Sequence, residues 1–444
     1  SEDSIIFKTR YFVYPLTVLF VIVSFLKLIS KFKLRLIRTN RIKSDLLVQA
    51  HAFDYENSVR KEYLSENYVF DKKKVSLLIT DLWRPCNNEQ LEKFKNKLKE
   101  KGIRFIDVKD FVISFSDLIS ISSMVLIRTV IGCKSIRSYN DFYTYILFVY
   151  QFSLETIYLK NFNCKAILCF DDYLPLHVIR TLIYRRYSIK TFGIQHSTGG
   201  GLYTNPYLSY ICFDKYLIWG EFYRKLFDPF WEDIDTVKLS YNRIDNLLRK
   251  WHSKKMDLTQ AQSVFGKNKK NILIAVPNLS RMKDYEHIGN AAGMINFLQE
   301  LDESILDKAN IYIRPPHLKG VDQFRKLINN DGVNFVLTND CSTTELICLS
   351  DLVISATSSG IICEASLLRA KFICYDYSGF YAKYWMRFGK DIYLDTADSL
   401  FNTIKTFSDN EPLNIDWDYL WNEVVYPNNG NTNQVIENLL NKIR

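Results

Sequence analysis

The sequence lacks any pair or cluster of cysteines at the spacing of a metal site. Its nine cysteines are scattered, and neither a CxxC pair nor a Cys/His cluster occurs among them. Most lie inside apolar runs, such as the run from Ala166 to Phe170. An odd number of cysteines in strand-like runs indicates buried free thiols in a reducing cytoplasm.

An apolar run long enough to cross a bilayer upright is also missing. The stretch from Tyr11 to Leu26 is almost entirely apolar but has only 16 residues, against roughly 20 for a span. A signal peptide carries its charges before the apolar run, whereas here the strong charge follows it. The pattern indicates a hydrophobic anchor lying in the membrane, and a buried core helix is the alternative.

No acidic residue lies between Lys27 and Lys43, a stretch that holds seven basic residues. Removing these seven lowers the formal net charge from +9 to about +2, which does not describe a protein that grips nucleic acid. Basic residues beside an apolar anchor face the anionic lipids of the cytoplasmic leaflet. We therefore expect residues 1–43 to associate with an anionic membrane surface, either spanning the membrane or lying on it.

The rest of the chain is long enough for two domains, because 444 residues exceed what one hydrophobic core ordinarily supports. After a polar connector over 44–72, strand-like apolar runs alternate with helical patterns. Strands are expected at 74–80, 104–108, 165–170, 191–195, 215–219, 271–276, 310–314, 334–337, 352–356 and 372–375. Helices are expected at 89–101, 141–159, 174–186, 287–301, 321–329, 343–349, 361–368 and 431–443. The alternation predicts an α/β fold of two doubly wound, Rossmann-like domains, 44–260 and 261–444, with the last helix either staying in the second domain or returning to the first.

The sharpest candidate site follows the expected strand at 352–356. Thr357, Ser358, Ser359 and Gly360 come directly before a helix, and Glu364 lies one turn into it. Hydroxyls, a glycine that allows close backbone approach and free N–H groups at a helix start together favour an anion. We expect donor phosphates at this loop and ribose hydroxyls at Glu364. The alternative is an ordinary serine N-cap on a structural helix.

This strand, Ser-Ser-Gly loop and Glu-containing helix resemble the donor half of GT-B glycosyltransferases. The likeness is to the bacterial capsule, lipopolysaccharide and sialyl/Kdo-transferase groups, which also carry a His-Pro motif after an earlier strand. At the corresponding place this sequence reads Arg314-Pro-Pro-His317, so the histidine follows the prolines instead of preceding them, and an arginine stands first. The resemblance implies that both side chains meet the donor phosphates. A proline-rich turn with a solvated histidine is the alternative.

The first half carries the other part of the resemblance. Gly193-Ile-Gln-His196, with glycines shortly after it, is similar to a Gly-Ile-Gln-His-Gly stretch of surface-carbohydrate transferases. Asp171 and Asp172 follow the expected strand at 165–170, and the acidic pair resembles the base motif of bacterial sialyltransferases, although Tyr173 stands where a glycine is expected. We expect one aspartate to take the acceptor proton and His196 to face the interdomain cleft. A helix N-cap and a structural histidine are the alternatives.

The resemblance implies a metal-independent transferase without a cofactor. Many retaining GT-B enzymes carry two glutamates eight positions apart, and Ala356 stands eight residues before Glu364, which favours inversion. A nucleotide-sugar donor, preferably a CMP-linked acidic sugar of the Kdo or sialic type, and a glycan or glycolipid acceptor are expected at the cytoplasmic face of a bacterial inner membrane. Alternatives are a UDP-, GDP- or dTDP-sugar donor, a polyol-phosphate transferase of teichoic-acid type, a GT-B epimerase and a non-catalytic membrane scaffold. The apolar anchor disfavours the epimerase.

Overall fold

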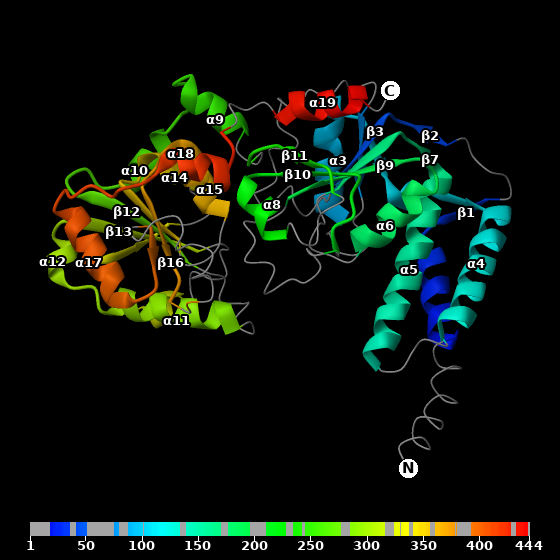
Figure 1. The fold of residues 1–444 in the computed structure, drawn as a ribbon, viewed down its shortest axis with the longest axis horizontal. Coiled ribbons are helices and arrows are strands. Elements are labelled where there is room, and N and C mark those ends of the chain that lie inside the picture. Colours follow the sequence, from blue (N-terminus) through cyan, green and yellow to red (C-terminus); the bar gives the residue numbers. More distant parts are fainter. Residues whose placement is uncertain are drawn as a thin grey trace, which may run out of the picture.

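The computed structural model describes eighteen stretches of the chain. They are residues 18–35, 41–50, 75–79, 88–100, 102–133, 139–169, 176–195, 210–227, 234–241, 245–276, 285–315, 324–328, 330–336, 341–355, 360–377, 379, 392–427 and 432–442. These residues form two large parallel β-sheets, one in each half of the chain (Figure 1). The predicted α/β class with parallel sheets is thereby confirmed.

The first sheet has seven strands in the order β11-β10-β9-β8-β3-β4-β5. Their bounds are β3 (Leu46–Ala50), β4 (Val75–Ile79), β5 (Phe105–Asp107), β8 (Ala166–Cys169), β9 (Lys190–Ile194), β10 (Lys215–Ile218) and β11 (Thr236–Lys238). One expectation was wrong, because residues 46–50 belong to a central strand rather than to a polar connector. Leu46 and Leu47 are fully buried between β4 and β8. The run is short and has polar flanks, so its periodicity is weak.

Helices cover this sheet and extend beyond it. They are α3 (Asn88–Glu100), α4 (Phe115–Cys133), α5 (Tyr139–Asn161), α6 (Leu176–Arg185) and α8 (Glu221–Phe227). The sequence assigned α3, α5 and α6 but not α4. Short parallel pairs tie the amino-terminal segment to this half: β1 (Lys33–Arg35) pairs with β6 (Val112–Ser114), and β2 (Ile42–Lys43) pairs with β7 (Phe162–Asn163).

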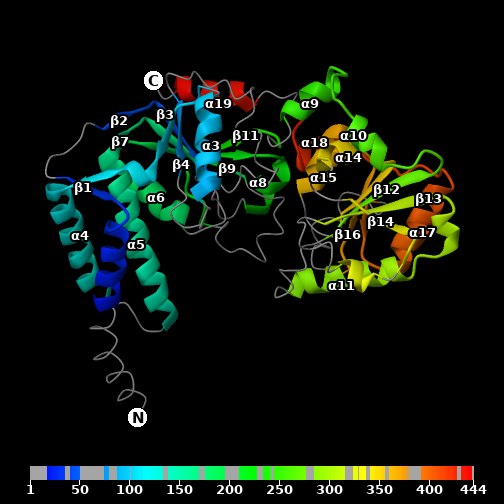
Figure 2. The same cartoon turned by 180° about the vertical axis from the view of Figure 1, so that it is seen from behind.

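Residues 18–29 form a helix that lies between α4 and α5 in both views (Figures 1 and 2). Its buried side chains, Val21, Phe25 and Leu28 among them, belong to one cluster with Ile121 of α4 and Phe152 of α5. The segment is therefore packed into the first half along one face. In the part of the chain that the structure describes, no helix meets the length and hydropathy needed to cross a membrane.

The second sheet has six strands in the order β14-β13-β12-β15-β16-β17. Their bounds are β12 (Lys270–Ala275), β13 (Ala309–Arg314), β14 (Val333–Phe335), β15 (Leu352–Ser355), β16 (Phe372–Tyr375) and β17 (Tyr393–Leu394). The helices of this half are α10 (Thr259–Val264), α11 (Tyr285–Gln299), α12 (Glu303–Leu306), α14 (Thr343–Leu349), α15 (Gly360–Leu368) and α17 (Ala397–Ser408), and α9 (Asp245–His252) precedes them. The expected strands over 271–375 agree with these bounds to within two residues.

The carboxyl end of the chain returns to the first half through α18 (Trp417–Glu423) and α19 (Thr432–Lys442). Ile436 and Leu439 of α19 share a buried cluster with Leu46, and both views place α19 beside α3. Gly220, after β10, allows α18 to approach closely, since a Cβ there would lie 2.2 Å from the Glu423 carbonyl oxygen. The two halves are thus joined twice, once through α9 and once through α18.

Candidate functional site

Seven predicted site residues lie outside the described residues, but the strands that lead to them are described. The seven are Asp171, Asp172, His196, His317, Thr357, Ser358 and Ser359. β8 ends at Cys169 and its neighbour β9 ends at Ile194, so the two segments leave the same edge of one parallel sheet. In the other sheet, β13 ends at Arg314 and β15 at Ser355. The predicted residues thus follow carboxyl ends of parallel strands, where ligands of such sheets bind.

Glu364 lies in the first turns of α15, and both of its carboxylate oxygens are engaged by hydroxyl groups. Thr344, in the first turn of α14, donates to Oε2 at 3.0 Å. The Tyr241 hydroxyl donates to Oε1 at 3.3 Å. Because each of its two oxygens accepts a hydrogen bond from a hydroxyl group, the Glu364 carboxylate is held in one orientation. Its partly exposed side chain suits contact with a ligand.

Tyr241 joins the two halves at this point. It follows β11 of the first sheet, whereas Gly360 and Glu364 follow β15 of the second. The tyrosine is 2% exposed, and the ring of Trp219 meets its ring edge to face at a centroid distance of 4.7 Å. The carboxyl edges of the two sheets therefore meet where Tyr241 contacts the start of α15.

A chain of contacts leads from this meeting point to the segment that holds His196. The backbone N–H of Trp219 donates to the Gln195 side-chain oxygen at 2.7 Å. Gln195 is buried and directly precedes His196. Trp219 packs on Tyr241, which in turn donates to Glu364. Two of the motifs that the sequence singled out, more than 160 residues apart, are thus connected through Trp219 and Tyr241, neither of which was a predicted site residue.

Arg314 ends β13, and its guanidinium is engaged inside the second half. It is 5% exposed, and its Nη2 donates to the Cys341 carbonyl oxygen at 3.3 Å and to Thr343 Oγ1 at 3.4 Å. These contacts fix Thr343, the first residue of α14. The next residue, Thr344, donates the hydrogen bond to Glu364. Its expected contact with a donor phosphate stays a prediction.

A buried ionic network that the sequence did not reveal lies beside β3 and β8. Arg180 of α6 donates from Nε to Glu155 of α5 at 2.8 Å, and both side chains are almost fully buried. Nη1 of the same guanidinium donates hydrogen bonds to the Gln49 side-chain oxygen at 3.3 Å and to the Cys169 sulfur at 3.3 Å. Tyr184 donates to the second Glu155 oxygen at 2.7 Å. The network thus fixes the end of β8, from which the Asp171 segment continues.

Burial and nearby charge also raise the pKa of a thiol on α14 that lies near Glu364. Burial, followed by the charges of Glu345 and Glu364, raises the pKa of Cys348 to about 12. The thiol therefore stays neutral at physiological pH and is no candidate nucleophile. Among the described residues no group of three or more metal-ligating side chains occurs.

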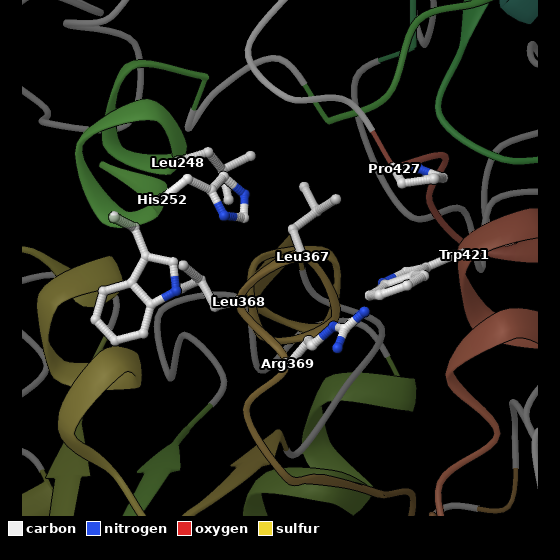
Figure 3. A pocket seen from close by; sticks show the side chains of 8 residues that line it. Leu248, His252, Leu367, Leu368, Arg369, Trp421 and Pro427 are labelled. Carbon is white, nitrogen blue, oxygen red and sulfur yellow. The ribbon is translucent and has the colours of Figure 1, made fainter. Parts of the chain in front are cut away.

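A pocket of about 460 Å³ lies at the other end of α15 (Figure 3). It is lined by Leu248, Trp251, His252, Leu367, Leu368, Arg369, Trp421 and Pro427, from α9, the end of α15 and the α18 region. The Arg369 guanidinium lies over the Trp421 ring, 4.4 Å from its centroid. The described residues of the candidate site, Arg314, Gly360 and Glu364, do not line it.

Comparison with known proteins gives the fold but no family. No family model and no curated protein matches the sequence. Among solved structures, UDP-GlcNAc 2-epimerase from Neisseria meningitidis superposes with a TM-score of 0.51 at 14% identity, over 90% of this chain and 100% of that one. UDP-GlcNAc 2-epimerase from Methanocaldococcus jannaschii gives 0.50 at 12%, over 90% and 99%. A glycosyltransferase from Rickettsia africae gives 0.48 at 11%, over 91% and 99%. At these identities the first two structures show the fold alone, and the chain shares their α/β fold.

Proposed function

We propose that the chain is an inverting glycosyltransferase that moves a sugar from a nucleotide donor to a glycan or glycolipid. The observation that carries the proposal is the fixed carboxylate of Glu364, held by Thr344 and by Tyr241 of the other half. A carboxylate with both oxygens already oriented binds a pair of vicinal hydroxyls with little further loss of side-chain freedom. The ribose of a nucleotide presents such a pair.

The position of Glu364 on α15 supports the same assignment. It lies four residues after Gly360, which corresponds to about 6 Å along a helix. Phosphates are favoured at a helix start, where the N–H groups lack partners inside the helix. Ser358, Ser359 and Gly360 would hold the donor phosphates there, while Glu364 holds the ribose one turn away. That separation fits a nucleoside phosphate lying along the first turn.

The acceptor chemistry would come from the first half. Asp171 or Asp172 would take the proton of the acceptor hydroxyl as it attacks the anomeric carbon. His196 would orient the hydroxyl or steady the leaving phosphate. Because β8 and β9 are parallel neighbours, their carboxyl ends lie side by side, at the edge of the sheet where Tyr241 contacts the second half. Arg314 and His317 are proposed to complete the phosphate site.

The donor class is proposed as a CMP-linked acidic sugar, with UDP-, GDP- and dTDP-sugars as the alternatives. The names of two structures with this fold mention UDP-GlcNAc, so UDP-GlcNAc belongs in any donor panel, together with a measurement of its epimerisation at C2. A product still attached to the nucleotide would identify an epimerase. A product attached to an acceptor would identify a transferase.

Thermal unfolding of the full chain with CMP, CDP, UDP, GDP and dTDP tests the proposal. A nucleotide that binds only the folded state raises Tm by mass action. We expect one of them to do so and Glu364→Gln to weaken its binding at least tenfold. Glu437→Gln is the matched control, because Glu437 is an exposed acid on α19. The proposal fails if no nucleotide raises Tm, which would favour a non-catalytic scaffold.

A further inference from the structure

Two neighbouring helices of the first half expose large apolar side chains on their outer faces. Helix 18–29 exposes Leu19, Phe20, Ile22, Val23 and Leu26, and α4 exposes Phe115, Ile119, Leu126 and Ile127. These are nine of the sixteen large apolar side chains that are exposed in the described residues. Single exposed apolar residues are ordinary, but a concentration of them on adjacent helices marks an interaction surface.

The described part of the α4 outer face differs in composition from an ordinary solvated helix. Over residues 115–129, whose side chains the structure describes, the exposed residues besides the four large apolar ones are Ser116, Ser120 and Ser123. By contrast, α3 exposes a face of lysine, glutamate and asparagine, from Glu89 to Glu100. Both helices belong to the same half and both bury their other face. The different composition of the two outer faces indicates that the α4 face contacts something other than water.

The exposed residues stand on a packed frame rather than on loose chain. Buried residues of helix 18–29, such as Val21 and Phe25, share one cluster with Val125 of α4 and Val149 of α5. The Tyr145 hydroxyl of α5 donates to the Arg128 carbonyl oxygen of α4 at 2.5 Å. The three helices project from the seven-stranded sheet as one unit (Figure 1).

Positive charge borders the apolar surface. Lys27 ends the apolar face of helix 18–29, and Lys31, Lys33 and Arg35 follow it. Burial, followed by the nearby charges of Lys27 and Lys109, lowers the pKa of Lys31, so three lysines from two segments share one region. Asp110 pairs with Lys33 at 3.0 Å. Asp117, the single acid of α4, is buried and lies 3.3 Å from Lys160.

We propose that helix 18–29 and α4 together form a membrane-docking surface that lies on an anionic lipid leaflet. Apolar side chains beside clustered lysines match the two layers of a leaflet, its acyl boundary and its charged headgroups. The sequence placed only residues 1–43 on the membrane; the structure adds α4, which follows that segment by more than 70 residues. A second copy of the chain fits less well, because both copies would bring positive charge to the border of the contact.

Flotation of the full-length protein with lipid vesicles tests this proposal. We expect binding to vesicles that contain phosphatidylglycerol and weak binding to phosphatidylcholine alone, with the difference reduced by salt. The paired substitution Leu126→Ser with Ile127→Ser should lower the partition coefficient at least tenfold. Lys27→Gln with Lys31→Gln should lower it only on anionic vesicles. Lys93→Gln with Lys97→Gln on α3 removes the same charge elsewhere and should leave binding unchanged.

The possible outcomes distinguish a lipid membrane from a second copy of the chain as the partner of this surface. Unchanged flotation of the Leu126/Ile127 variant, with Tm equal to that of the wild type, would remove α4 from the surface and overturn the proposal. Absence of vesicle binding together with a dimer that the same variant dissociates would assign the surface to copy–copy contact instead. Nucleotide binding, measured on all variants, should not change, so failure here is distinguishable from failure of the transferase assignment.

Discussion

The hydroxyl of Tyr241 occupies the space in which a side chain at residue 360 would begin. A Cβ built on Gly360 would lie 2.6 Å from Tyr241 Oη, with ring carbons at 3.2 Å and 3.3 Å. The same hydroxyl donates to Glu364 Oε1 at 3.3 Å. Gly360 is thus required by contact between the two halves of the chain, in addition to any need for close approach by a phosphate.

Gly360→Ala should therefore destabilise the protein, by about 1–3 kcal/mol, because the tyrosine ring is held by Trp219 and cannot retreat freely. Tyr241→Phe removes the nearest atom and should recover part of this loss in the double variant. We expect a coupling of at least about 0.5 kcal/mol in a double-mutant cycle of unfolding free energies. Additive effects would show that the two residues do not contact each other in solution.

The donor loop is tested by Ser358→Ala combined with Ser359→Ala. Loss of both hydroxyls should weaken binding of the nucleotide identified by the thermal screen at least tenfold, about 1.4 kcal/mol. Isothermal titration measures the affinity directly. Ser116→Ala with Ser120→Ala on α4 is the control, because it removes two exposed serines far from this loop in the sequence. An unchanged affinity in the first variant would place the phosphates elsewhere.

The base assignment is tested by Asp171→Asn and Asp172→Asn, made separately. Each keeps the shape of the side chain and removes its basicity, so one of them should lower turnover by about two to four orders of magnitude. Donor affinity should stay near that of the wild type, because the proposed function places the aspartates on the acceptor side. Normal transfer by both variants would move the base elsewhere, and His196→Gln would be the next variant to assay.

The Arg180–Glu155 pair should be among the most sensitive positions of the first half. Arg180→Met leaves the Glu155 carboxylate buried without its cation, which we expect to cost about 3–5 kcal/mol of unfolding free energy. Chemical denaturation measures the loss. Lys93→Gln, which breaks the exposed pair with Glu89, should change stability by less than about 0.5 kcal/mol. Equal effects of the two substitutions would contradict the burial of the network.

Cys164 gives a test that depends on pH. Burial, followed by the charge of Cys169, raises its pKa from 9.0 to about 12. Its folded-state pKa lies above the unfolded one, so the resulting stabilisation is present below pH 9 and is lost as the pH rises towards 12. At pH 8.5 we expect alkylation of Cys164 to be at least about a hundredfold slower in the native protein than in urea. Peptide mapping by mass spectrometry follows this residue. Comparable rates would show that the thiol is accessible.

Local sequence pattern was sufficient for most strands and helices. Strand β12 and helix α14 lie where the sequence placed them, because a buried parallel strand is a continuous apolar run and a helix start carries its own cap. Ser342 and Glu345 form a capping box that is visible in the sequence. The pattern failed for β3, whose short apolar run lies in a polar stretch, and for α4, whose two faces are both apolar.

The candidate site divides in the same way. The Ser-Ser-Gly loop, Glu364 and the aspartate pair are recognisable in the sequence because each chemistry needs its residue types at short spacing. The sequence gives no sign of the contacts that Tyr241, Trp219 and the Arg180–Glu155 pair make. Each of these acts on residues far away along the chain, and no local pattern records such a partner.

By itself the sequence determined the α/β class, the order of the elements and the chemical groups that stand at the ends of the strands. Only the tertiary structure decided that Tyr241 reaches α15, that α19 packs on the first half, and that α4 lies beside helix 18–29. The physical reason is that periodicity and capping depend on neighbours within a few residues. Contacts across hundreds of residues arise when two apolar faces are buried together, and the sequence shows each face but not its partner.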